Sequence, residues 1–193
     1  MKKLSICTLS VLLLSAISIA NAQNPTEKKE MPATKTDMDM SDCPMMKDHG
    51  PNAKKEEHFE KMMANGTKAM GFSQTATTHH FLLMSDGGAI QVEVNETADE
   101  ANRSAIRSHL SEIAKQFANG IFTTPFAVHG KMPDGAKAMD ELKSEIKYSY
   151  EETPNGGRVR ISTADPRARE AIYQFLRFQI NEHKTGDPLE PSK

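Results

Sequence analysis

The sequence predicts an α+β domain built from a duplicated ββα unit and preceded by a disordered tail. Two stretches of alternating apolar and polar residues, each next to a Gly-Gly pair, predict two β-hairpins. An amphipathic helical pattern follows each hairpin, whereas residues 23–70 contain too few aliphatic side chains to form a core. The most economical packing is a four-stranded antiparallel sheet with both helices on one face.

The first half of the domain begins with strands over residues 79–84 and 89–94, joined by a turn at 86–88. Two pairs define the expected register: Phe81 with Val92, and Leu83 with Ile90. A helix is expected from Asp99 to Asn119, because apolar residues recur there at the spacing of one helical face. These residues are Ile106, Leu110, Ile113 and Phe117.

The second half repeats this order after a Pro- and Gly-rich connection over residues 122–135 and a short helix expected over 136–143. Strands are predicted at residues 145–151 and 158–162, around a turn that contains Gly156 and Gly157. Asp165 and Pro166 are typical of the N-cap and first turn of a helix. Its inner face is expected to carry Ile172, Phe175, Leu176, Gln179 and His183.

The two halves also match in their glycines. The pair Gly87-Gly88 and the later Gly120 correspond to Gly156-Gly157 and Gly186. We interpret this match as an internal duplication with a pseudo-twofold axis. The alternative is that any two ββα units share turn glycines and apolar stripes. The predicted domain covers residues 71–188, and residues 189–193 form a C-terminal tail.

The first 22 residues have the pattern of a secretory signal peptide. Lys2 and Lys3 precede an apolar run, and residues 20–22 form a small-x-small cleavage site, so cleavage is expected after Ala22. The run is too short for a stable membrane span, and no second one follows. We therefore expect a periplasmic or secreted protein with no membrane span in the mature chain.

Net charge and cysteine content limit the partners and the disulfides that we expect for this chain. The chain holds 24 Lys and Arg against 26 Asp and Glu, and loss of Lys2 and Lys3 leaves a formal charge of −4. This balance does not favour nucleic acid or an anionic membrane as a partner. Cys7 lies within the signal, so Cys43 is the only expected mature cysteine and cannot form an internal disulfide.

Residues 23–70, the expected tail, are rich in soft metal donors. Eight of the twelve methionines lie between Met31 and Met70. Thioether, thiolate and imidazole groups suit Cu(I) and, to a lesser degree, Zn. The first-choice ligands are Cys43, Met45, Met46 and His49, which lie within seven residues. We expect copper binding or buffering, with zinc or silver as other candidates; the alternative is a linker in which the methionines are incidental.

A second-choice pair lies further along this segment. If residues 54–64 form a short helix, His58 and Met62 are four residues apart on one face, which is a workable chelating pair.

The domain itself carries further histidines. His79 is expected on the helix-covered face of its strand and His80 on the open face near Glu93. His79, His109 and His183 are expected to approach one another under the helices, where three imidazoles would make a copper or zinc site. The alternative is that His183 interacts with its helix dipole and His109 borders the core.

No catalytic constellation is identified, and we expect a protein that is not an enzyme. The sequence shows no nucleophile turn and no phosphate-binding loop. The alternative to metal binding is a module for a protein or small ligand, with another periplasmic protein as one candidate partner. Its site would be the sheet face around His80 and Glu93 or the 122–135 connection. An enzyme that uses His79 or His109 ranks third.

Several runs resemble a family of small exported bacterial proteins without an established role. They are Met70-Gly-Phe, Thr77-Thr-His-His-Phe81, Gly87-Gly88, Ile106-Arg-Ser-His-Leu110 and Phe175-Leu-Arg-Phe-Gln-Ile-Asn-Glu-His183. Some similar proteins are labelled aspartate carbamoyltransferase. That enzyme needs two α/β domains and a Ser-Thr-Arg-Thr phosphate loop, and this chain has neither. Residues 37–49 are similar in style to the Met/His tails of periplasmic copper and silver resistance proteins, which implies copper handling.

Overall fold

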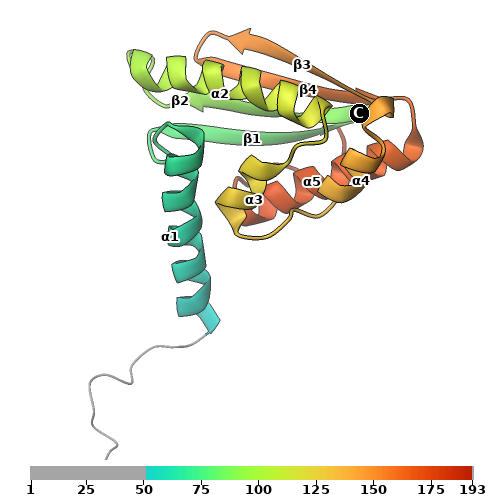
Figure 1. Ribbon diagram of the computed structural model, residues 1–193. Coiled ribbons are helices and arrows are strands. Elements are labelled where there is room, and N and C mark those ends of the chain that lie inside the picture. The colour runs from blue at the N-terminus through green and yellow to red at the C-terminus, as the bar shows by residue number, and fades with distance from the viewer. Residues whose placement is uncertain (1–50, 193) are drawn as a thin grey trace, which may run out of the picture. The chain divides into compact units, whose positions relative to one another are not determined.

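The computed structural model describes residues 51–192 (Figure 1). The expected signal peptide and the first-choice metal ligands lie outside these residues. Within the described part of the chain, no helix has the length and apolar character needed to cross a membrane.

A four-stranded antiparallel sheet forms the centre of the domain, which confirms the predicted α+β class (Figure 1). The strand order is β1-β2-β4-β3, so each hairpin keeps its two strands adjacent and β1 and β3 lie at the edges. The strands are β1 (Thr77–Met84), β2 (Gly87–Val94), β3 (Ile146–Thr153) and β4 (Gly156–Thr163).

Two long helices, α2 (Glu100–Ala118) and α5 (Pro166–His183), bury their apolar faces on the sheet in one core. Both begin at the predicted aspartate. The Asp99 side chain accepts a hydrogen bond from the backbone N–H of Asn102 at 3.0 Å, and Asp165 accepts one from that of Arg167 at 2.7 Å. These bonds satisfy N–H groups that the first turn leaves free.

The hairpin registers support the predicted duplication. Thr77 pairs with Val94 and Ile146 pairs with Thr163, so a shift of 69 residues carries the first hairpin onto the second with the same pairing. The same shift relates Ile90 to Val159, and these two residues pair with each other across β2 and β4. The pseudo-twofold axis therefore passes between Ile90 and Val159.

The predicted register of the first hairpin is wrong by two residues, although the apolar face is correct. Phe81 pairs with Ile90, not with Val92. The reason is that Gly87 belongs to the strand and not to the turn. Its φ is +140°, and an added Cβ would lie 2.3 Å from the carbonyl oxygen of Ile161 on β4. The glycine therefore permits close approach of two strands.

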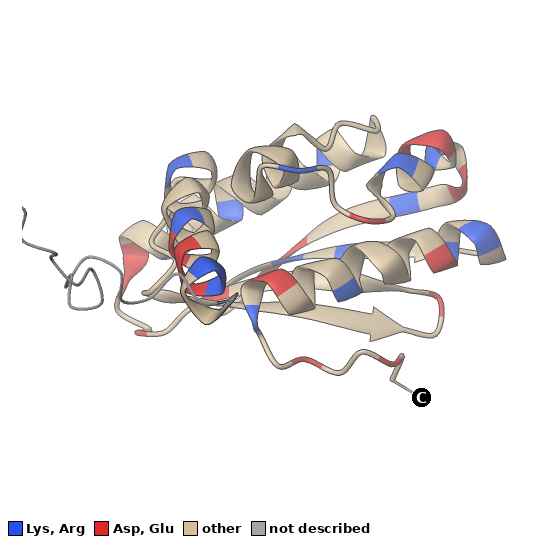
Figure 2. Ribbon diagram, turned by 90° about the horizontal axis from the view of Figure 1, so that it is seen from below, with Lys and Arg blue, Asp and Glu red and all other residues tan. Residues whose placement is uncertain are grey.

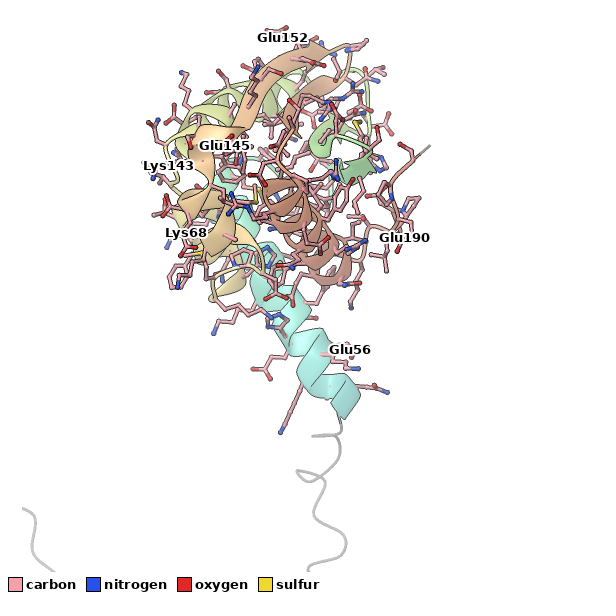
Figure 3. All side chains as sticks on the ribbon, turned by 90° about the vertical axis from the view of Figure 1, so that its right-hand side faces the viewer. Glu56, Lys68, Lys143, Glu145, Glu152 and Glu190 are labelled. Carbon is pink, nitrogen blue, oxygen red and sulfur yellow. The ribbon has the colours of Figure 1, made fainter. Side chains whose placement is uncertain are left out.

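The expectation of a flexible segment is wrong for residues 51–70. They form helix α1 (Pro51–Met70), which packs against α3 and carries Met62 with only 2% of its surface exposed. Glu56, near the start of α1, is exposed and lies away from the rest of the domain (Figure 3).

The connection between the halves is also more ordered than expected. It contains α3 (Thr123–His129), which is followed by α4 (Ala136–Glu141) and a 3₁₀ turn (Lys143–Glu145). The expected C-terminal tail is partly paired, because the backbone N–H of Ser192 donates to the carbonyl of Leu83 on the β1 edge at 3.1 Å. Such cover protects an edge strand from other chains.

Charges are mixed over the helices. Lys or Arg residues and Asp or Glu residues occur on each of α1, α2 and α5 (Figure 2). Each of these three helices therefore carries charges of both signs.

If α1 is part of the folded domain, truncating Met62 must cost stability. We expect Met62→Ala to lower the free energy of unfolding by about 2 kcal/mol or more, because it leaves a cavity in a buried site. Urea denaturation measures this loss, and the exposed neighbour Lys61→Ala is the control. Equal stability of the two variants would show that α1 does not pack as described.

Candidate functional site

The structure places three of the predicted site histidines around one cavity. His79 comes from β1, His109 from α2 and His183 from the last position of α5. The cavity has a volume of about 60 Å³ and lies between the two long helices and the sheet. Apart from these imidazoles and a few polar groups, apolar side chains of the core line it.

Ring contacts hold these imidazoles in place. The rings of His79 and His183 stack with centroids 5.4 Å apart. The ring centroid of Phe72 lies 5.8 Å from that of His79 and 5.7 Å from that of His109, so the Phe72 ring contacts both histidines. The Nε2 atom of His79 is buried and has no hydrogen-bond partner among the described residues. A buried polar atom without a protein partner is costly unless water or a ligand pairs with it, and the hydroxyls of Tyr148 and Tyr150 are in the same condition elsewhere in the domain.

His129 belongs to the same cluster, which sequence reasoning missed. It lies at the end of α3, is buried, and contacts the ring of His183 at 5.1 Å. Its Nε2 atom is 2.9 Å from the side-chain oxygen of Gln179. The spacing of Pro125, Val128 and His129 is that of one helical face. This pattern could have revealed the residue, but prolines and glycines suggested an irregular connection.

Burial keeps the cluster uncharged at neutral pH. It lowers the pKa of His79 to about 4, with smaller contributions from His109 and His80. Burial also lowers the pKa of His109 to about 4 and that of His183 to about 3. The pKa of His129 is lowered for the same reason, although Gln179 and Glu182 act in the opposite direction. The neutral imidazole is the form that binds metals.

The other predicted ligands of the described chain are not brought to this cavity. The Nε2 atom of His58 lies 2.8 Å from Oε2 of Glu182, at hydrogen-bond distance. His58 and Met62 both lie on α1, four residues apart as predicted, but Met62 is buried. Within residues 51–192, no three His, Cys, Asp or Glu side chains are placed to hold a metal ion together.

His80 has a different neighbour from the one predicted. Glu93 pairs with Thr78, whereas the Nδ1 atom of His80 lies 2.9 Å from Asp187. Asp187 also accepts a hydrogen bond from the backbone N–H of Phe81 at 2.9 Å. His80 therefore anchors the chain that follows α5 to the β1 edge.

No protein-family model, no curated protein and no solved structure matches this chain. Inference about function therefore depends on the residues and their arrangement.

The buried histidines predict an acid-sensitive fold. In metal-free protein with a chelator present, the native state keeps these groups neutral, whereas the unfolded state protonates them below their ordinary pKa of 6.5. The unfolded state binds more protons between about pH 6.5 and 4, so stability falls as the pH falls through this window. Each histidine contributes up to about 1.4 kcal/mol per pH unit.

Urea denaturation across this pH range measures the effect. We expect His183→Phe to flatten the pH dependence, because it removes one titrating group. Phenylalanine is the residue at the equivalent position of α2, Phe117, since a shift of 66 residues relates the N-caps Asp99 and Asp165 of the two helices. If the free energy of unfolding falls with pH at the same slope in parent and variant, His183 is not one of the buried groups that cause the acid sensitivity.

Proposed function

We propose that this protein is exported and binds or buffers a soft metal ion, with copper as the first candidate and zinc or silver as alternatives. One observation carries the proposal: Cys43, Met45, Met46 and His49 lie within seven residues. Thioether sulfur keeps its ligand power in an acidic or oxidising compartment, because it needs no deprotonation to bind a soft ion. Residues 37–49 also contain four aspartates, which add negative charge around these donors.

The methionine content of this segment supports the same conclusion. Methionine in proteins most often fills gaps in a core. Met62, which lies in α1, does so, since it is almost fully buried. The methionines at positions 38–46 lie in a stretch with no aliphatic residue nearby to form a core, so packing does not account for them.

Titration with Cu(I) against a competing chelator tests the proposal. We expect a Cys43→Ser, Met45→Leu, Met46→Leu variant to bind copper about tenfold more weakly or worse, because it lacks three of the four first-choice donors. Met132→Leu is the matched control, since it removes an exposed thioether outside this segment. Unchanged affinity in the triple variant would remove the proposal.

A second candidate function is protein binding through the connection between the halves. Ile121, Phe126 and Met132 are 44%, 50% and 51% exposed, and they lie within twelve residues around α3. Exposed apolar side chains that gather in one place favour a protein contact. In this case residues 37–49 would be only a spacer.

Deletion of residues 23–50 separates the two candidates. The deletion ends before α1, because a longer one would remove the buried Met62. We expect the shortened protein to stay folded, by circular dichroism, and to bind less copper than the parent. If it retains the copper capacity of the parent, residues 23–50 do not hold the ion.

A further inference from the structure

The three histidines that line the cavity have a pseudo-symmetric counterpart in the duplicated fold, and this counterpart shows which other residues can pack at the same positions. The strands are related by a shift of 69 residues, and the helix N-caps Asp99 and Asp165 by a shift of 66. These shifts give three equivalences: His79 with Tyr148, His109 with Phe175, and His183 with Phe117.

The three equivalent residues, which come from both halves of the chain, form an aromatic cluster. The ring centroid of Phe117 lies 5.7 Å from that of Phe175 and 6.1 Å from that of Tyr148. Phe122 stacks on Phe117 with the ring centroids 4.5 Å apart. The architecture therefore accepts large aromatic rings at all three positions. Imidazoles are polar, and their burial costs free energy that a phenyl ring does not. At two of the three positions, those of His109 and His183, the equivalent residue is a phenylalanine, and two buried imidazoles in place of phenyl rings favour a chemical role over a packing role. The equivalent of His79 is Tyr148, whose buried hydroxyl also lacks a partner among the described residues.

A thioether completes the set of donors around the cavity. Met70, at the end of α1, lines the same space as His79, His109 and His183. The volume of about 60 Å³ is well below the roughly 150 Å³ of a cavity that admits benzene. The cavity therefore has room for an ion or a few waters, but not for an aromatic ligand.

The donors are also accessible from the surface. His79 and His183 line a cleft of about 260 Å³, together with Phe59 and Met63 of α1. His109 and Met70 line another cleft, of about 420 Å³. The imidazoles and the thioether thus separate the inner cavity from outer clefts, so a small ion can meet a ligand before it enters.

We propose that Met70, His79, His109 and His183 form a second site for Cu(I), which is separate from the donors of residues 37–49 and also accepts Ag(I). The inference deepens the proposed metal binding and rests on it. Thioether and imidazole ligands select Cu(I) over hard divalent ions. Cu(I) binds with low coordination numbers, so a thioether with one or two of the imidazoles suffices without the three-donor cage that His, Cys, Asp and Glu do not form in residues 51–192.

Silver titration of a full mature chain tests this site. The background variant is Cys43→Ser, Met45→Leu, Met46→Leu, His49→Gln, which leaves the cavity intact because these residues precede α1. We expect it to retain bound Ag(I), to unfold at a higher temperature with Ag(I), and to shift the imidazole ¹⁵N signals of His79, His109 and His183.

Two further changes in that background locate the ion. Met70→Leu keeps the side-chain size, and His109→Phe introduces the residue of the equivalent position, Phe175. We expect each to weaken silver binding by about tenfold or more, a loss seen even for residues that only support a ligand. Circular dichroism verifies that they fold, and Met132→Leu is the control for a thioether elsewhere.

The outcomes distinguish the two proposals. If the parent binds silver and the background variant does not, the cavity site is overturned and the donors of residues 37–49 remain. If the background variant binds silver but Met70→Leu and His109→Phe bind it equally well, the ion lies elsewhere and the cavity site is again overturned. If the parent binds neither copper nor silver, both proposals fail, and the cavity holds only water.

Discussion

The antiparallel pairing of β2 with β4 is the constraint on which the rest of the domain depends. It places Ile90 opposite Val159, two residues that the internal duplication makes equivalent. Because the pairing is centred on this point, the two hairpins extend in opposite directions, and α2 and α5 lie on one face of a continuous sheet. The sheet therefore positions the two helices, which meet through the rings of Phe117 on α2 and Phe175 on α5.

The space between these helices and the sheet is filled in two different ways. Near Phe117 and Phe175 aromatic rings pack at distances of ordinary core contacts. The cavity lies beside this cluster: Phe117 and Phe175 line it together with His183, Met70 of α1, and Thr124 and Val128 of α3. A pseudo-symmetric fold thus contains one aromatic cluster, in which the Tyr148 hydroxyl is polar, and one cluster that combines imidazoles with a thioether. The first shows what stability alone requires, and the difference between them carries the inference of a ligand.

The order of the residues along the chain connects the two proposed metal sites. Soft donors lie just before α1, and Met63 and Met70 lie on α1 beside the clefts and the cavity. Helix α1 also contacts the C-terminal end of α5. His58 lies at hydrogen-bond distance from Glu182, and the ammonium group of Lys184, the residue after α5, lies 4.2 Å from the centre of the Phe59 ring. Helix α1 is therefore a structural part of the domain and also carries Met70, one of the proposed ligands.

Local patterns in the sequence determined the two hairpins, the apolar faces of α2 and α5, and the aspartate caps at Asp99 and Asp165, because each depends on residues only a few positions apart. The approach of His79, His109 and His183 also followed, since strand and helix periods place all three on the inner face. Only the tertiary structure decided the burial of Met62, the contact of His129 with His183 and the bond between His80 and Asp187. These are contacts between segments distant in the chain, and no periodicity within a segment specifies which distant residue will cover it.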